Sequence, residues 1–327
     1  MKMKSYLPPL FLFLLASVVG IQAQGTISNA LAMDGKLSTL LSILNNNPAL
    51  TQLLDDKSYG QRTFLAPSNT ALANYTANLT SSGNTQTLME AILSYHIMNG
   101  SFPASNLTSP GGVAAATFLQ NSQYTNLGNG SSGNVVYASQ YGSSGESNTP
   151  GKLEVFGGVG NSAPIVTTDI RYGNGYVHIV DDLLPLPQTC TGSMGKLSLS
   201  SLLVALNNAE LSQTLDGTPH VTCFAPTQDA FTAAGSPENK LPKPDLVNAL
   251  MFHTLGKAMY SPDLKTGASY QTLANQSIKV VRDGGALYLE GDGGGKAKVV
   301  MGNVIVKNGV MHVIDQVRLS FSKVGFC

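Results

Sequence analysis

Two histidines that are each followed three residues later by an aspartate are the residues in this sequence most suggestive of catalysis. They are His178 with Asp181 and His312 with Asp315. A histidine held by a carboxylate could act as a general base. Both pairs, however, occur in apolar runs typical of buried strands, where side chains three positions apart point to opposite faces. We therefore predict histidines that are hydrogen-bonded in the core rather than His-Asp pairs.

Other chemistry is weakly supported by the residues. His96 could approach His178, but two histidines without a thiolate or carboxylate make a poor metal site. Ser68 lacks the G-x-S-x-G turn of a nucleophilic serine and is more simply a helix cap. The glycine-rich run 291–296 is typical of a hairpin turn rather than a phosphate-binding loop. The sequence thus predicts no enzyme, no catalytic residue, no cofactor and no metal site.

The strands that carry the two histidines belong to a larger internal repeat. Residues 175–181 read GYVHIVD and residues 309–315 read GVMHVID. Each is preceded, in the same order, by leucine-rich helical segments, a strand ending in Ala-Pro, and a helix ending in an aromatic residue and a histidine. Helices that come first and strands that come later predict an α+β domain, present twice.

The repeat also predicts the domain organisation. We expect a first domain at 24–187 and a second at 188–327, with a linker around Pro185 and Pro187. The first copy carries about 23 more residues before its final strand. We assign them to a Gly-, Ser- and Asn-rich insertion at 120–151, which is typical of a long flexible surface loop or an edge extension, and we favour a tolerated insertion over a functional one.

These motifs resemble those of the fasciclin (FAS1) domain. Residues 63–72 and 222–231 match its strand-turn pattern T-h-F-A-P-x-x-x-A-h, and Tyr95-His96 resembles its tyrosine-histidine motif, with Phe252-His253 in the second copy. The two histidine strands resemble its final strand. The resemblance covers nearly all of the chain after residue 23. It implies two tandem domains, each a two-sheet β-wedge with packed helices.

The family resemblance also implies a function. Fasciclin proteins are mostly extracellular or cell-surface glycoproteins of adhesion and of matrix or wall contacts, and they occur in fungi. We therefore expect a fungal, non-catalytic adhesion or wall and matrix module that binds extracellular protein or wall polysaccharide. The alternative is a secreted carrier of a small apolar ligand, held between the sheets or at the domain junction. The residues singled out are Tyr95, His96, Phe252 and His253 as interaction candidates, and His178, His312, Pro67 and Pro226 as structural core.

The N-terminus predicts secretion. Residues 1–23 combine two lysines, an apolar run at 10–19 and a small-residue cleavage site, as in a signal peptide. The remaining chain shows neither a second spanning stretch nor the hydrophobic tail of a glycolipid anchor. Charged residues are only 12% of the chain and its formal net charge is zero, which favours neither nucleic acid nor an anionic membrane.

Sequons and cysteines agree with an extracellular route. Six Asn-x-Ser/Thr sequons predict N-glycosylation, at Asn74, Asn78, Asn99, Asn106, Asn129 and Asn275. The three cysteines allow three pairings in an oxidising compartment. We predict a Cys190–Cys327 disulfide and a buried, inert Cys223.

Overall fold

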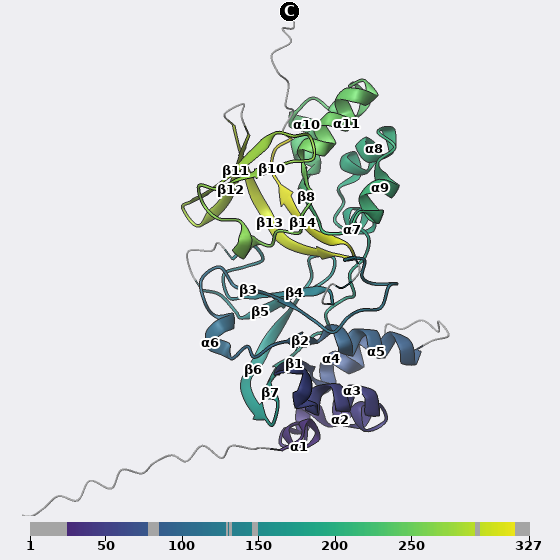
Figure 1. Cartoon of the computed structure of the whole chain (residues 1–327), viewed down its shortest axis with the longest axis vertical. Helices are drawn as coiled ribbons and strands as arrows, with labels where there is room; N and C mark the ends of the chain where they lie inside the picture. Colours follow the sequence, from purple (N-terminus) through teal and green to yellow (C-terminus); the bar gives the residue numbers. More distant parts are fainter. Residues whose placement is uncertain are drawn as a thin grey trace, which may run out of the picture.

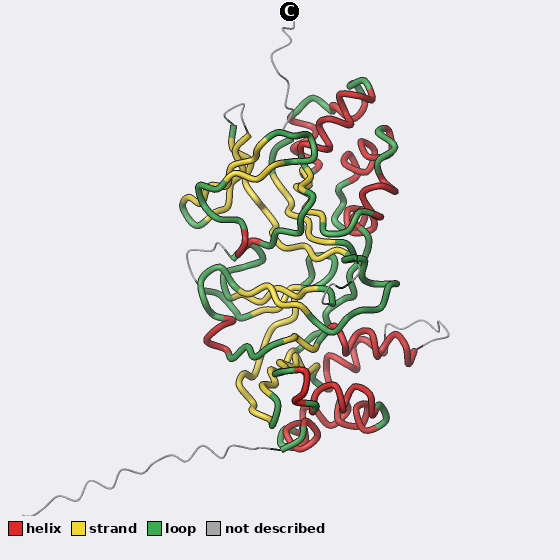
Figure 2. Tube along the Cα trace, viewed as in Figure 1, coloured by secondary structure: helices red, strands yellow, loops and turns green. Residues whose placement is uncertain are grey.

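The computed structural model describes residues 25–77, 85–128, 130, 133–145, 150–291 and 295–317. These residues form two seven-stranded sheets, each with its own group of helices (Figures 1 and 2). We call the first sheet with its helices domain 1 and the second sheet with its helices domain 2. The signal peptide predicted at 1–23 lies outside the described residues.

The elements follow the predicted order of helices before strands. Domain 1 contains α1 Ile27–Ala32, α2 Ser38–Asn45, α3 Pro48–Asp55, β1 Arg62–Pro67, α4 Asn69–Ala77, α5 Thr85–Tyr95, β2 Ile97–Asn99, α6 Ala104–Leu107, β3 Val113–Ala116, β4 Val135–Ser139, β5 Glu154–Phe156, β6 Ser162–Tyr172 and β7 Gly175–Val180. Domain 2 contains α7 Cys190–Lys196, α8 Ser200–Asn208, α9 Ser212–Gly217, β8 Val221–Pro226, α10 Gln228–Ala233, α11 Lys243–Phe252, β9 Thr254–Leu255, β10 Ser269–Gln271, β11 Ser277–Asp283, β12 Ala286–Gly291, β13 Lys296–Val306 and β14 Gly309–Ile314.

The two sheets share one topology. Their strand orders are β2-β1-β7-β6-β5-β4-β3 and β9-β8-β14-β13-β12-β11-β10. The pairs β1·β7 and β8·β14 are parallel, whereas the other pairs are antiparallel. The long strands β6 and β13 each pair with different neighbours along their length and thereby join the two halves of a wedge. The predicted α+β fold of two tandem wedges is confirmed.

In each domain, residues of the strand-turn motif end the first strand and cap the helix that follows it. The Ser68 hydroxyl accepts a hydrogen bond from the Ala71 amide (3.2 Å) at the start of α4. The Thr227 hydroxyl does the same for the Ala230 amide (3.1 Å) at the start of α10. Both caps satisfy amides that have no partner inside their helix. Ser68 is therefore a cap, as predicted.

Each central strand is buried on both faces. In β1, Phe64 packs against the leucines of the helices, while its neighbour Leu65 packs on the other face with Tyr95 and Val180. In β8, the side chain of Phe224 lies in the corresponding second cluster. Burial of both faces explains why these strands read as continuous apolar runs rather than as alternating ones.

The predicted insertion at 120–151 is not one loop. Strand β4 lies inside it and is a regular member of the sheet, paired with β3 and β5. Its equivalent in domain 2 is β11, by position in the strand order. The additional residues lie in two connections, 117–134 before β4 and 140–153 after it, against 272–276 and 284–285 in domain 2. The prediction of one inserted surface loop or edge extension is corrected accordingly, because β4 lies inside the sheet.

Candidate functional site

The first histidine of the repeated strands is a core residue. His178 has no exposed surface, and its Nε2–H donates to the Phe102 carbonyl (2.8 Å). Its Nδ1 accepts a hydrogen bond from the Asp169 amide (3.1 Å), which fixes the proton on Nε2. Burial lowers the pKa of His178, because the apolar surroundings disfavour the charged ring.

Its counterpart in domain 2 has equivalent partners. The Nε2–H of His312 donates to the Met259 carbonyl (2.9 Å), and Nδ1 accepts from the Asn303 amide (3.4 Å). Burial lowers the pKa of His312 to about 4. Both donor residues, Asp169 and Asn303, have positive φ angles and lie at irregularities of the long strands. Sequence reasoning missed them, although Asp and Asn are residue types that tolerate positive φ.

The aspartates that follow these histidines have other partners. Asp181 accepts a hydrogen bond from the Ser68 hydroxyl (2.8 Å), which ties the end of β7 to the start of α4. Asp315 accepts one from the Lys298 amide (2.7 Å) and closes the end of β14 on β13. Both carboxylates therefore stabilise the ends of the strands and do not pair with the histidines.

Tyr95 and His96 were predicted as interaction candidates, and the structure buries both completely. The Tyr95 hydroxyl donates to the Val135 carbonyl on β4 (2.9 Å). His96 Nδ1–H donates to the Ile92 carbonyl (2.8 Å), and its Nε2 accepts from the Leu184 amide (3.1 Å). With no exposed atoms, this pair does not form a contact surface. Its hydroxyl and ring connect α5 to the sheet and to the linker.

The equivalent pair in domain 2 is also internal. Phe252 and His253 are 3% and 5% exposed, and their rings meet edge to face at 5.9 Å. His253 Nδ1–H donates to the Ala249 carbonyl (2.8 Å), as His96 does to its own helix. Because both pairs are buried, the prediction that they are interaction residues is corrected. The sequence shows the residue types of such a motif but does not show how deeply they are buried.

The prolines of the two Ala-Pro turns were also predicted to belong to the structural core. Pro67 and Pro226 are buried at the ends of β1 and β8, opposite Val180 and Ile314. Proline lacks an amide hydrogen, so it suits the last position of a strand before a helix cap. This placement agrees with the structural role expected of them.

Cys190 carries a free thiol in this structure. It has no exposed surface, and its sulfur donates to Asn308 Oδ1 (3.3 Å). Cys327, its predicted partner, lies outside the described residues. The Cys190–Cys327 disulfide therefore stays a prediction, with Cys190 in the helical core of domain 2. Cys223 is also free and buried, and burial raises its pKa to about 12.

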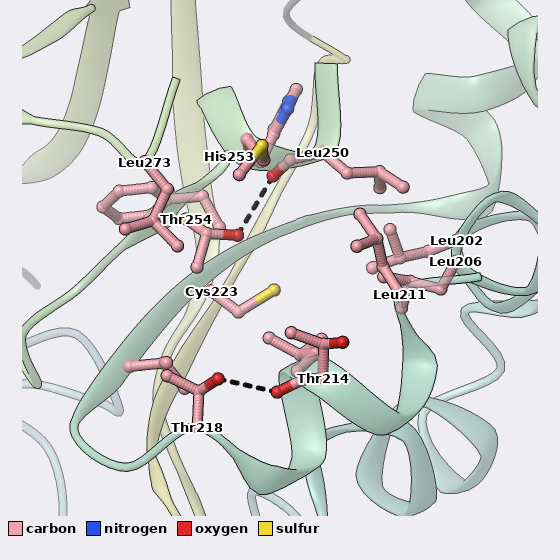
Figure 3. Close-up of a pocket in the computed structure, with 14 residues that line it drawn as sticks. Leu202, Leu206, Leu211, Thr214, Thr218, Cys223, Leu250, His253, Thr254 and Leu273 are labelled. Atoms are coloured by element: carbon pink, nitrogen blue, oxygen red, sulfur yellow. Dashed lines mark hydrogen bonds between the residues drawn. The ribbon is translucent and has the colours of Figure 1, made fainter. Parts of the chain in front are cut away.

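Domain 2 contains a cavity of about 80 Å³ between α8, α9, α11 and the first strand, β8 (Figure 3). Leucines of the helices form one wall of the cavity, and Cys223 projects into it from β8. The Thr218 hydroxyl donates to the Thr214 carbonyl (2.7 Å), and the Thr254 hydroxyl donates to the Leu250 carbonyl (3.0 Å). Because these two hydroxyls are bonded to backbone and most other lining residues are hydrocarbon, the surface of the cavity is mainly apolar.

Two segments of the chain match the model of a known protein family. The fasciclin domain model matches residues 35–187 and again residues 197–319, which is most of the chain. The chain belongs to the fasciclin domain family. Each of the two matches contains one of the seven-stranded sheets.

Known relatives include fungal fasciclin proteins. A fasciclin-like arabinogalactan protein of Arthroderma benhamiae is 28% identical over 86% of this chain and 63% of its own length, so the chain spans less than two thirds of that relative. The fasciclin-like arabinogalactan protein elcF of Phaeosphaeria nodorum is 26% identical over 90% of this chain and 88% of its own. A solved FAS1 domain pair from the insect cell adhesion molecule Fasciclin I is 22% identical, with a TM-score of 0.42, over 88% of this chain and 97% of the other.

The two fasciclin domains are joined by hydrogen bonds from the additional loops of domain 1. The buried amide of Asn134 donates to the Val306 carbonyl on β13 (3.2 Å), and the Asn126 amide donates to the Lys307 carbonyl (2.6 Å). After β4, the Ser143 carbonyl accepts from the Asn303 side chain (2.7 Å). Figure 1 shows β13 and β14 lying against the end of domain 1 that carries β3, β4 and β5.

Apolar contacts complete this interface. The buried residues Tyr260, Ile305 and Val310 of domain 2 pack against Ala114 and Val135 of domain 1, which are partly buried. The loops that we predicted to be tolerated insertions therefore hold the two fasciclin domains together. This role is not visible in the sequence, because the contacts join residues more than 150 positions apart.

The Asn134→Ala variant is expected to weaken the interface. It removes a buried hydrogen bond and leaves the Val306 carbonyl without that donor, which costs about 1–3 kcal/mol. Calorimetry of the full chain should show a lower unfolding temperature, and hydrogen exchange should increase in the peptide that contains residues 299–306. The matched control is Asn46→Ala, because Asn46 is exposed and bonds only within domain 1, to the Ser42 carbonyl. Equal exchange in the 299–306 peptide of both variants would contradict this role of Asn134.

Proposed function

We propose that this chain is a secreted glycoprotein that acts as a non-catalytic adhesion module, in contact with cell wall polysaccharide or an extracellular matrix protein. Membership of the fasciclin family and the two fungal fasciclin-like arabinogalactan relatives support the class of function. The observation that carries the proposal is the docked domain pair. Backbone and side-chain hydrogen bonds hold the two domains as one unit that can present a single continuous surface.

The chemistry of the described residues supports recognition by surfaces. Among them no group of three or more His, Cys, Asp or Glu side chains could hold a metal ion. The ring nitrogens of His178 and His312 are bonded to backbone groups. A buried neutral histidine with both nitrogens bonded orders the strands around it. Binding is therefore proposed for exposed side chains and glycans instead of the tyrosine-histidine motif.

The placement of sequons supports the glycoprotein part of the proposal. Four of the six predicted sequons lie within the described residues, and their asparagines are exposed, at Asn74, Asn99, Asn106 and Asn275. Asn78 and Asn129 lie outside the described residues. Glycans at exposed sites would hydrate a surface that has few charges. No helix of the described chain has the length and hydrophobicity needed to cross a membrane.

Binding assays on the full chain test this function. The secreted protein, with and without enzymatic removal of N-glycans, is applied to arrays of wall polysaccharides and matrix proteins. We expect saturable binding that changes by less than about twofold between low and high salt, because charged residues are only 12% of the chain and few ion pairs with a ligand can be screened. If the chain bound no wall polysaccharide, matrix protein or cell surface at any salt concentration, the proposal would be wrong.

A second candidate, the carriage of a small apolar ligand, is favoured by the cavity of domain 2. This cavity lies between helices and sheet, and not between sheets or at the domain junction where such a ligand was expected. Several equivalent positions of domain 1 carry larger side chains, which explains why this space is open in domain 2.

A further inference from the structure

We propose that domain 2 binds the alkyl chain of a neutral amphiphile in the cavity between α8, α9, α11 and β8. This site is independent of the proposed adhesive function. The inference rests on a comparison of structurally equivalent positions in the two domains, on the lining of the cavity, and on its mouth.

The floor of the cavity is a position where domain 1 has a large aromatic residue. In domain 1, Phe64 of β1 pairs with Ile97 of β2, and in domain 2 Cys223 of β8 pairs with Thr254 of β9. Phe64 has no exposed surface and packs in the helical core cluster of domain 1. Cys223 and Thr254 both line the cavity, so two smaller side chains stand where domain 1 has a phenylalanine and an isoleucine.

A third position shows the same change at the mouth. The Phe118 amide donates to the Ile97 carbonyl (3.1 Å), and the Leu273 amide donates to the Thr254 carbonyl (2.9 Å). Phe118 and Leu273 are therefore equivalent, and Leu273 lines the cavity. The smaller leucine leaves space that the phenylalanine ring takes up in domain 1.

At a fourth position, domain 1 has a large buried side chain and domain 2 has a small one. Arg62 begins β1 and Val221 begins β8, and their amides donate to the equivalent carbonyls of Asn174 and Asn308. The Arg62 side chain is buried, with its guanidinium carbon 4.6 Å from the centre of the Phe118 ring. Val221 lines the cavity and carries no such group. These four positions around the cavity carry smaller side chains in domain 2 than in domain 1, whereas Met251 at the mouth is larger than its equivalent, Ser94.

The lining of the cavity selects an uncharged hydrocarbon. None of its fourteen lining residues is Asp, Glu, Lys or Arg. Apolar cavities stay dry, so an apolar occupant displaces no ordered water. The volume of about 80 Å³ is below the ~150 Å³ of a cavity that accepts benzene, so it holds only part of an alkyl chain, whose remainder extends through the mouth.

The mouth of the cavity indicates that the occupant is an amphiphile. Met251 and Leu273 are 37% and 41% exposed, whereas Leu206 and Cys223 deeper inside are 3% and 4% exposed. An alkyl chain can therefore enter past two flexible apolar side chains while its polar end remains in water. The absence of a charged residue from the lining gives a carboxylate or ammonium head no advantage over a hydroxyl.

Primary alcohols from butanol to octanol test the proposal on the full chain. Binding is followed by the methyl NMR signals of Met251 and Leu273. We expect saturable shifts, with an affinity that rises about fourfold per added methylene until the cavity is full and then stops rising. Hexanoate and hexylammonium should bind no more tightly than hexanol. If no alcohol shifted these signals, or if the charged analogues bound tenfold more tightly, the proposal would be overturned.

The variant Cys223→Phe restores the residue found in domain 1 and should reduce hexanol affinity more than tenfold. Leu273→Phe fills the mouth from the exposed side and provides a second test if Cys223→Phe does not fold. Val166→Phe is the control, because Val166 is 45% exposed on β6 of domain 1. We expect parental affinity in the control. Parental affinity in a folded Cys223→Phe or Leu273→Phe variant would place the binding elsewhere and overturn the proposal.

Discussion

Replacing Gly309 by alanine is expected to unfold domain 2. Gly309 begins β14 with a φ of +154°, and a β-carbon there would lie 2.0 Å from the Val221 carbonyl oxygen. That oxygen belongs to β8, the parallel partner of β14, so relief of the clash requires the central strands to separate. We expect a loss of more than about 4 kcal/mol, in the range of the most damaging single substitutions. Gly175→Ala should do the same to domain 1, because its β-carbon would lie 1.8 Å from the Arg62 carbonyl oxygen.

Secretion yield and thermal unfolding followed by circular dichroism would measure this effect. Two other glycines serve as controls. Gly217→Ala meets no atom within 4 Å at an ordinary φ, and Gly267→Ala meets none at a φ of +81°. The first should be nearly neutral, and the second should cost about 1 kcal/mol from backbone strain alone. A Gly309→Ala protein as stable as the Gly267→Ala protein would show that the strands can shift to accept a side chain.

Acidification is expected to destabilise both domains between pH 6.5 and pH 4. Burial lowers the pKa of His96 and of His312 to about 4, from the usual 6.5. In this interval the unfolded chain binds protons that the folded chain does not, so the stability falls as the pH falls. At ~1.4 kcal/mol per pKa unit, each of these histidines accounts for about 3 kcal/mol, fully lost below pH 4. The pKa of His178 is also lowered, so this histidine adds to the loss in domain 1.

Urea unfolding of the full chain at several pH values would test this dependence. The variant His312→Gln removes one titrating group, so the stability of domain 2 should change less between pH 6.5 and pH 4, although it should be lower at pH 7. Val304→Ala is the matched control, because Val304 is equally buried and does not titrate. It should lower the stability by a similar amount at every pH. An unchanged pH dependence in His312→Gln would show that His312 is not the group responsible.

Much of the fold follows from local patterns. The strand-turn pattern at 63–67 and 222–226, the helix starts after it and the repeated histidine strand all lie where the sequence predicts them. These features depend on apolar periodicity and on caps formed by residues two or three positions away, and both are visible in a short stretch of sequence. The same local logic correctly separated His178 from Asp181, because it needs only the alternation of side chains along a strand.

The candidate interaction residues show where local patterns fail. Tyr95 and His96 are polar residues at a helix end, a position compatible with exposure. The structure instead covers them with β4 and the linker, through the Val135 carbonyl and the Leu184 amide. Burial depends on segments 40 and 88 residues further along the chain, which no local window contains.

By itself, the sequence determined the duplicated α+β domains, the family and the core position of His178 and His312, since each depends on nearby residues. Only the tertiary structure decided what the additional loops and the smaller side chains do. Asn134 lies against Val306 across the domain junction, and Cys223 lies beside Thr254 and Leu273 around a cavity. Both arrangements result from packing between segments distant in the chain. The physical reason is that a contact surface or a cavity is a property of facing elements, and its volume depends on side chains that no single motif brings together.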